Sequence, residues 1–253
     1  MKILSFHNKR FEQAVRESLN RPSGPIFDTD APSVKTLDCN FSFDVEDVPV
    51  LRSFRNLASL YIETDYSNCD AIRDAFFDMT NMEVIDVCWK SGDLDFHMFQ
   101  NMRQLTHFFI TGGDISCMDL LHPEVLVEMK QLHTVSLHEF GSVDLAFLES
   151  MPQLRSFFCG YADHVDHPDA ISSLIHLEDL TLVDIKLKDL RFLDTLPDSL
   201  ELELLACEFP QMIDLKSLDR FRHVDLNEII IMGEEQLPYE HWNKHEDNEP
   251  AQS

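Results

Sequence analysis

A single apolar pattern recurs along the chain and limits what it can fold into. Written L-x-x-L-x-L, with any apolar residue allowed, it has its fourth position at residues 37, 60, 85, 108, 135, 157, 180, 202 and 224. Consecutive copies are therefore 22 to 27 residues apart. The copy at 199–204 begins with Ser199, and we expect the neighbouring Leu200 to take its first position. A period of this length is typical of a solenoid, in which each copy is one unit that stacks on the next.

Each unit divides into a strand and a returning segment. Alternate side chains of a strand point to one face, so the fourth and sixth positions of each copy are expected to point into the core. Later apolar residues, such as Leu190, Leu193 and Leu196, are expected to form the opposite, convex wall. A single unit buries too little apolar surface to fold alone, and stacking supplies the missing burial. The predicted fold class is therefore α/β, a horseshoe-shaped solenoid with a parallel concave sheet of about nine strands.

The ends of such an array need covers. Residues 8–19 have the apolar spacing of an amphipathic helix, with Arg and Glu on the opposite face. The apolar face of that helix consists of Phe11, Ala14, Val15 and Leu19. We predict an N-terminal helical cap over residues 1–33, about nine repeats over 34–232, and an acidic, mobile C-terminal tail over 233–253.

The first of these segments resembles a known family. The stretch FEQAVRESLNRPSGPIFDTDAPSVKTLDC resembles the N-terminal cap and first repeat of internalin-like bacterial leucine-rich repeat proteins. The matching residues are Ala14, Val15, Arg16, Leu19, Asn20, Pro22, Gly24 and Ile26. Downstream, KDLRFLDTLP resembles the repeat of about 22 residues that this group shares with phosphatase-regulating proteins. The resemblance covers about residues 8–230, and implies a leucine-rich repeat solenoid that binds another protein on its concave sheet.

One part of the family pattern is missing. These repeats usually carry an asparagine three residues after the sixth position, where it satisfies backbone groups of the loop. The residues here are Ser42, Asp65, Lys90, Gly113, Phe140, Ala162, Ile185, Cys207 and Ile229. Other hydrogen bonds must replace the asparagine ladder, and we expect an irregular array.

Charge narrows the choice of partner. The chain has 46 acidic and 20 basic residues, a formal net charge of −26, and protonation of all 12 histidines would leave it negative. Such a surface repels phosphate backbones, and no basic cluster offsets this, so nucleic acid is excluded as a partner. The negative electrostatic potential favours a basic protein or peptide as the partner, although strong acidity can also serve only to keep a protein soluble.

Cysteine usage and hydropathy indicate the compartment. The six cysteines are far apart and contain no C-x-x-C pair, so neither a zinc knuckle nor a redox motif is supported. The N-terminus has only a short apolar patch, and no apolar run approaches the length of a membrane span. We therefore expect a soluble, cytoplasmic, bacterial protein with reduced thiols and no membrane association, unless a native leader has been removed from the sequence.

Aromatic residues in the predicted strands suggest where a partner binds. In the alternating pattern, the residue between the fourth and sixth positions of each copy points to the concave face. We expect the same of the residue that lies two positions after the sixth. Large apolar groups on a solvent-facing surface commonly mark an interface, although rings that stack on one another, or a tail that folds over them, would also account for them. The predicted protein-binding residues are Tyr61, Asp86, Trp89, Phe109, His138, Glu139, Phe158, Tyr161 and Asp184.

Catalytic and metal sites have weaker support. The segment HVDHPD places His164 and His167 near two aspartates, which would suit a metal-dependent hydrolase, but no second cluster completes a ligand shell. No nucleophile elbow or phosphate-binding loop is present. We therefore predict a protein-interaction module rather than an enzyme, with no cofactor and no metal. A charge-driven binder of basic proteins is the alternative, and an open sheet edge would allow a homodimer.

Overall fold

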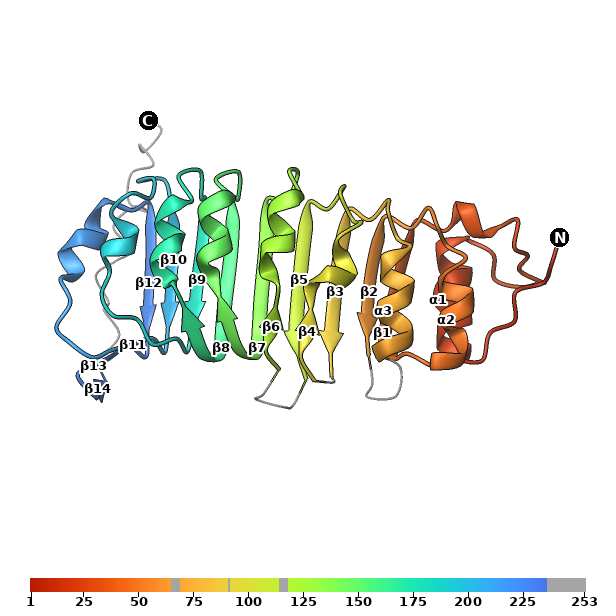
Figure 1. The fold of residues 1–253 in the computed structure, drawn as a ribbon, viewed down its shortest axis with the longest axis horizontal. Coiled ribbons are helices and arrows are strands. Elements are labelled where there is room, and N and C mark those ends of the chain that lie inside the picture. Colours follow the sequence, from red (N-terminus) through yellow and green to blue (C-terminus); the bar gives the residue numbers. More distant parts are fainter. Residues whose placement is uncertain (65–68, 91, 114–117, 236–253) are drawn as a thin grey trace, which may run out of the picture.

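The computed structural model describes residues 1–64, 69–90, 92–113 and 118–235, and its main element is one parallel sheet (Figure 1). The strands of this sheet are β1 (Thr36–Ser42), β2 (Ser59–Glu63), β3 (Val84–Trp89), β5 (His107–Gly112), β7 (Thr134–Asp144), β8 (Ser156–Asp166), β9 (Asp179–Val183), β10 (Glu201–Leu205) and β12 (His223–Asn227). Their spatial order in the 9-stranded sheet is their order along the chain. The nine strands coincide with the nine copies of the apolar pattern.

Strand register follows the repeat position by position. Leu37 pairs with Leu60, Leu60 with Ile85, and the fourth positions of later copies pair in the same way as far as β12. The fourth and sixth positions of every copy are buried, as predicted. Leu200 is also fully buried and takes the first position that Ser199 cannot fill. The predicted irregularity is present in the segments between the strands, which are α-helices in some repeats and 3-10 helices in others. The sheet itself is regular, because within the described strands the ladder shifts register only between β1 and β2.

A second layer of short helices covers the other face of the sheet (Figure 1). Its α-helices are α2 (Val48–Leu51) and α3 (Cys69–Phe77). The 3-10 helices are η1 (Ala31–Ser33), η2 (Val45–Asp47), η3 (Phe96–Phe99), η4 (Pro123–Glu128), η5 (Leu145–Ser150), η6 (Pro168–Ser173), η7 (Arg191–Leu193) and η8 (Leu215–Arg220). Side chains of Asp44, Asp95, Asp144 and Asp214 cap η2, η3, η5 and η8 by accepting a hydrogen bond from the N–H two residues later.

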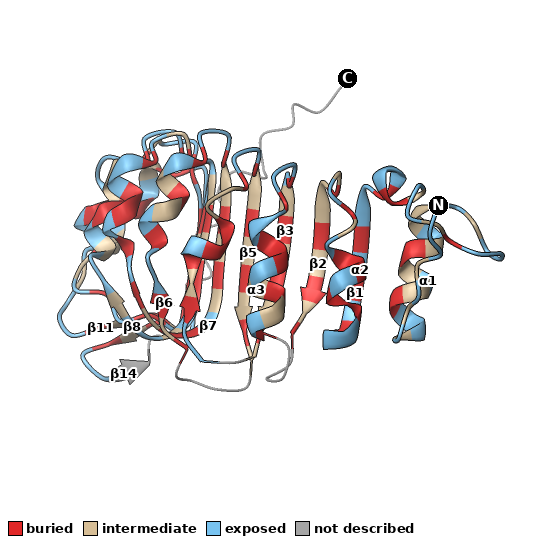
Figure 2. Cartoon of the chain, turned by 45° about the vertical axis from the view of Figure 1, so that its right-hand side comes forward, coloured by how far each residue is buried: buried red, intermediate tan, exposed pale blue. Residues whose placement is uncertain are grey.

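The core lies between these two layers. Leu190, Leu193 and Leu196 are buried there, so the sequence correctly placed the convex wall. Figure 2 shows the buried residues along the strands and on the inner sides of the helical segments. The sheet face that points away from the helices is called the concave face below.

The N-terminal helix α1 (Lys9–Ser18) packs on the first repeat. Phe11 and Val15 are fully buried, and the Phe11 ring meets those of Phe43 and Phe54 at centroid distances of 4.9 Å and 6.1 Å. The fully buried Asp47 accepts hydrogen bonds from the backbone N–H groups of His7 and Asn8, at 2.8 Å and 2.7 Å. A carboxylate of the first repeat therefore holds the chain where it enters the helix.

Two small sheets lie beside the main one. The first pairs β4 (Leu94–Asp95) with β6 (Leu120–Leu121), and the second contains β11 (Glu208–Phe209), β13 (Ile230–Ile231) and β14 (Glu234–Glu235). Most of the predicted tail, residues 236–253, lies outside the described residues. No helix among the described residues is long and apolar enough to span a membrane.

Other side chains and main-chain groups make the hydrogen bonds that the missing asparagine ladder would make. The buried Thr64 hydroxyl donates to the Cys88 carbonyl and accepts from the Lys90 N–H, both at 3.1 Å, which links repeats two and three. Near the other end, the Cys207 thiol donates to the Leu182 carbonyl at 3.3 Å. At the equivalent places Phe140, Ile185 and Ile229 are simply buried apolar residues. Main-chain bonds between repeats complete the set, such as Asp184 N–H to the Leu205 carbonyl at 2.8 Å.

Candidate protein-binding face

The middle column of the concave face has an alternating composition. Its side chains lie between the two inward positions of each strand, and register places them in a row across the sheet. In chain order the row is Asp38, Tyr61, Asp86, Phe109, Ser136, Phe158, Thr181, Glu203 and Asp225. From repeat one to repeat six, an aromatic residue on every even repeat follows a carboxylate or a hydroxyl on every odd one.

Asp86 lies between two of these aromatic residues. Its Cα partners are Tyr61 on β2 and Phe109 on β5, and all three side chains are partly buried. Burial, with a smaller contribution from the charge of Asp38, raises the pKa of Asp86. Burial and then the charge of Asp86 likewise raise the pKa of Tyr61. Within the described residues Asp86 has neither a cationic partner nor a side-chain hydrogen bond. A partly desolvated carboxylate therefore faces the open side of the sheet without a counter-charge.

A second aromatic group lies farther along the face. The imidazole of His138 stacks on the Phe158 ring at 5.5 Å and meets the Tyr161 ring edge-on at 4.8 Å. Gly160 makes this possible, because a Cβ there would lie 3.1 Å from the Phe158 ring and 2.9 Å from Cβ of Val183. Gly160 and Val183 were not among the predicted residues, although they occupy the next outward position in the same alternation. Rings that stack on one another, one of the two interpretations of the sequence, are present here.

Charged residues border this second group. Glu139 and Asp184 are exposed, and the nearest carboxylate oxygen of Glu139 is 3.8 Å from Nδ1 of His138. That distance is too long for a hydrogen bond, and this buried nitrogen has no partner in the described residues. Tyr161, which is 45% exposed, is the most open ring of the group. The predicted residues on β7, β8 and the end of β9 are thus brought together at the surface.

The prediction that Trp89 lies on the concave face was wrong. It is only 1% exposed, so its side chain belongs to the core and not to the concave face. In repeat three the strand stays extended through Trp89, and alternation turns this residue inward with Ile85 and Val87. In later repeats the equivalent residues Glu139 and Tyr161 have left-handed backbone conformations, with φ of 54° and 56°, which turn them outward.

The two histidines of the HVDHPD segment do not form one cluster. Nε2 of His164 lies 3.0 Å from a carboxylate oxygen of Asp166, whereas Nδ1 of His167 lies 2.8 Å from one of Asp144. Each histidine therefore has its own carboxylate in a separate pair. This geometry gives the alternative of a metal-dependent hydrolase no assembled ligand set at that loop.

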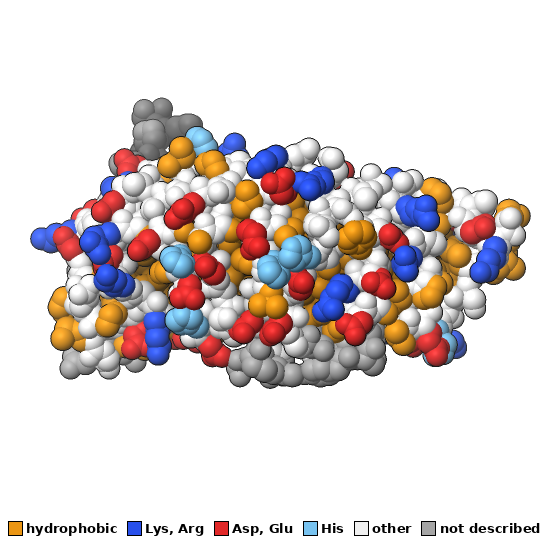
Figure 3. All heavy atoms as spheres, viewed as in Figure 1, with side chains coloured by type: hydrophobic (Ala, Val, Ile, Leu, Met, Phe, Trp, Pro, Cys, Tyr) orange, Lys and Arg blue, Asp and Glu red, His pale blue; other side chains and the backbone are white. Residues whose placement is uncertain are grey.

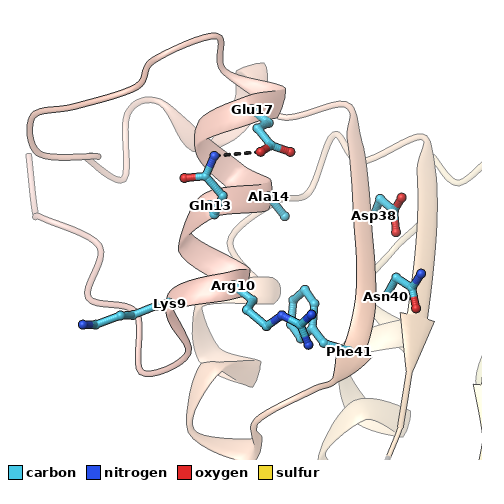
Figure 4. A pocket seen from close by; sticks show the side chains of 8 residues that line it. All are labelled: Lys9, Arg10, Gln13, Ala14, Glu17, Asp38, Asn40 and Phe41. Atoms are coloured by element: carbon cyan, nitrogen blue, oxygen red, sulfur yellow. Dashed lines mark hydrogen bonds between the residues drawn. The ribbon is translucent and has the colours of Figure 1, made fainter.

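A pocket of about 370 Å³ lies at the N-terminal end of the sheet, between α1 and β1 (Figure 4). Its lining residues are Lys9, Arg10, Gln13, Ala14, Glu17, Asp38, Asn40 and Phe41. The Arg10 guanidinium lies 5.6 Å from the centre of the Phe41 ring, and Gln13 donates to Glu17 at 2.7 Å. The pocket is open and mixed in charge, and it extends the concave face beyond the first strand.

Comparison with known proteins bears on the fold. No protein-family model matches the sequence, and a comparison with curated proteins finds no match. Among solved structures, internalin C2 from Listeria monocytogenes superposes with a TM-score of 0.63 at 14% identity, over 87% of this chain and 94% of that one. The leucine-rich repeat protein LIC12759 from Leptospira interrogans gives a TM-score of 0.54 at 14% identity, over 79% of this chain and 50% of that one. The fold is a leucine-rich repeat solenoid.

The match confirms the internalin-like resemblance inferred from the cap and the first repeat. A plant peptide hormone receptor, RGFR1 in complex with RGF2, has the same kind of solenoid, with a TM-score of 0.50 at 11% identity over 81% of this chain and 37% of that one. Identities this low show that the leucine-rich repeat fold is shared, and nothing finer.

Proposed function

We propose that this leucine-rich repeat solenoid is a non-enzymatic interaction module that binds a protein partner on its concave face. The observation that carries the proposal is the unpaired Asp86 carboxylate between Tyr61 and Phe109. A monomer gains nothing from a partly desolvated charge without a counter-ion, because its burial opposes folding. A cation from a partner would remove that penalty.

The chemistry around Asp86 defines the partner group that fits best. A lysine or arginine side chain placed there would meet a carboxylate and two aromatic rings, which combines an ion pair with cation–π contacts. The net charge of −26 would also attract a basic segment from a distance. The second group, around His138 and Phe158, offers mainly ring surface to apolar side chains of the same partner.

One solenoid of the same fold was solved with a bound partner. RGFR1, the plant peptide hormone receptor that shares this fold, was solved in complex with RGF2. We extend the idea of protein or peptide recognition to this chain on the strength of its own concave residues. The thiols of Cys39, Cys159 and Cys207 are free and buried, which supports a reducing compartment such as the bacterial cytoplasm.

Comparative affinity capture from a native lysate tests the proposal. The baits are the wild type, a Phe109→Ala/Phe158→Ala variant, and an Ile175→Ala/Met212→Ala control that removes exposed apolar groups from other surfaces. A partner held by the wild type and the control, but lost by the concave variant, supports the proposal. A partner held equally by all three baits contradicts it. Circular dichroism should first show that the three proteins are equally folded.

Salt separates the proposal from its charge-driven alternative. Binding dominated by net charge weakens strongly between low and high salt, because counter-ions screen exposed charges. Binding anchored by rings and a desolvated ion pair weakens much less. A partner that dissociates fully at high salt from both the wild type and an Asp86→Asn variant would favour the general acidic surface over this site.

A further inference from the structure

The helix-bearing face carries a group of side chains that the proposed function does not use. Strands β4 and β6 pair in parallel, with Asp95 opposite Leu121. His97 lies two residues after Asp95, inside η3, and His122 follows directly after β6. A left-handed backbone conformation at His122, with φ of 59°, turns the chain there before Pro123. Backbone pairing between repeats three and four thus brings residues 25 positions apart into one place.

The two imidazoles of this group lie against each other. Their ring centroids are 4.4 Å apart, and Figure 3 shows adjoining histidine side chains near the middle of this face. Nδ1 of His97 lies 2.8 Å from an oxygen of Asp95, and Nδ1 of His122 lies 3.2 Å from an oxygen of Glu124. Each imidazole thus has one nitrogen held by a carboxylate. Histidines that bind metals usually have a carboxylate partner outside the ligand set, which orients the ring and makes its other nitrogen a better ligand. Glu124 is such a partner for His122, whereas Asp95 lies close enough to His97 to be a ligand itself.

We propose that Asp95, His97 and His122 form a binding site for a divalent transition-metal ion of the Zn²⁺ class. One potential ligand atom from each residue lies within 4.8 Å of the other two. A tetrahedral ion with bonds of about 2.1 Å needs ligand atoms about 3.4 Å apart. The three side chains are about half exposed, so small rotations about side-chain torsions close that difference without moving the backbone. Water would complete the shell.

The donor set selects the metal. Two imidazole nitrogens and one carboxylate oxygen suit Zn²⁺, Ni²⁺, Co²⁺ or Cu²⁺, whereas Mg²⁺ and Ca²⁺ prefer oxygen ligands alone. The acidic protein also raises the local concentration of cations. Bound metal would join repeat three to repeat four on the side of the solenoid opposite the partner face.

Comparable groups elsewhere on the described surface lack this combination. The other group with three potential ligands, His7, Asp44 and Glu46, contains only one imidazole. His167 occupies the same place in its repeat as His122, with a left-handed backbone and a following proline. Its hydrogen-bonded carboxylate is Asp144, and within the described residues no second imidazole lies against its ring. His167 is therefore a natural internal control.

Calorimetric titration of untagged protein with zinc chloride tests the site. Three proteins are compared: the wild type, His97→Gln/His122→Gln, and the matched control His164→Gln/His167→Gln. The wild type and the control are expected to bind one more equivalent of Zn²⁺ than the His97/His122 variant, or to bind it at least about tenfold more tightly. Titration with Co²⁺ should show d–d absorption of a nitrogen- and oxygen-ligated ion in the same two proteins.

The two histidine variants distinguish a specific zinc site from non-specific association. All substituted histidines are exposed, so each variant should fold, and circular dichroism checks this. Equal zinc binding by all three proteins would mean adventitious association with surface histidines, and would overturn the proposal. So would the absence of zinc binding by the wild type. Partner capture on the concave face is a separate readout, and its failure would leave this site unaffected.

Discussion

Asp47 provides the sharpest test of how the N-terminal helix is held. Its fully buried carboxylate accepts two main-chain hydrogen bonds, of 2.8 Å from His7 and 2.7 Å from Asn8. Asp47→Ala removes both acceptors and leaves two N–H groups without partners. Hydrogen bonds to a charged acceptor contribute about 1.5–3 kcal/mol each, so the loss of two should lower the free energy of unfolding by about 3–6 kcal/mol. A domain typically has about 5–15 kcal/mol in total.

Two measurements would detect the loss of stability in Asp47→Ala. Urea denaturation followed by circular dichroism gives the free energy, and hydrogen exchange of the α1 amides shows whether the helix detaches first. The melting temperature should fall by roughly 10 °C, at about 2–4 °C per kcal/mol for a chain of this size. The control is Asp44→Ala, because that neighbouring aspartate is more exposed. It caps the short η2 and pairs with the exposed His7 side chain at 2.8 Å, whereas the main-chain N–H groups of His7 and Asn8 donate to Asp47. If the two variants lose equal stability, or α1 exchanges no faster in Asp47→Ala, the reasoning about the buried carboxylate is refuted.

Three further outcomes are expected. Since folding raises the pKa of Asp86, ionisation of this carboxyl opposes folding, and the loss of stability grows as pH rises from the ordinary carboxyl range through the raised pKa. Asp86→Asn should therefore have a higher melting temperature than the wild type, with a larger difference at pH 7 than at pH 4. The control Asp225→Asn, at an exposed position, should show no such increase. Burial raises the pKa of the Cys39 and Cys207 thiols to about 12, so both should resist alkylation in the folded protein. Peptide mapping after iodoacetamide treatment at pH 8 should find both unmodified until the protein unfolds. Rapid labelling of the native protein would contradict their burial. Leu180→Ala, in the middle of the ladder, should lower the free energy of unfolding by about 2–5 kcal/mol in urea, and a loss below about 1 kcal/mol would show that the repeat stack relaxes around the cavity.

The fold could be predicted because a solenoid is nearly one-dimensional. Each strand pairs only with its neighbours, so the spacing of residues such as Leu37, Leu60 and Ile85 determines both the number of strands and their register. Even the exception at Ser199 could be anticipated, because an apolar first position is needed and Leu200 is adjacent. Local burial was therefore predictable wherever the chain stays extended.

The end of each strand was harder to predict. Trp89 and Glu139 occupy the same position in their repeats, yet the first points inward and the second outward. The difference is the left-handed backbone at Glu139, a conformation that glycine or asparagine would have signalled and that glutamate does not. Residues that meet across the turn between repeats, such as His97 and His122, were missed for a related reason. Their contact depends on the path of β4 and β6, and no apolar pattern indicates it.

The alternation in the middle column has a consequence for the length scale of recognition. Neighbouring strands are about 4.8 Å apart, so Tyr61, Phe109 and Phe158, on every second repeat, recur at intervals of about 10 Å. A polyproline II segment advances about 3.1 Å per residue with three residues per turn, so every third side chain faces the same way at nearly the same interval. A segment laid across the strands would keep in step with the rings only if its contacting side chains recur at every third position. A β-strand ligand would fall out of step within a few repeats, because its like-facing side chains recur about every 6.6 Å.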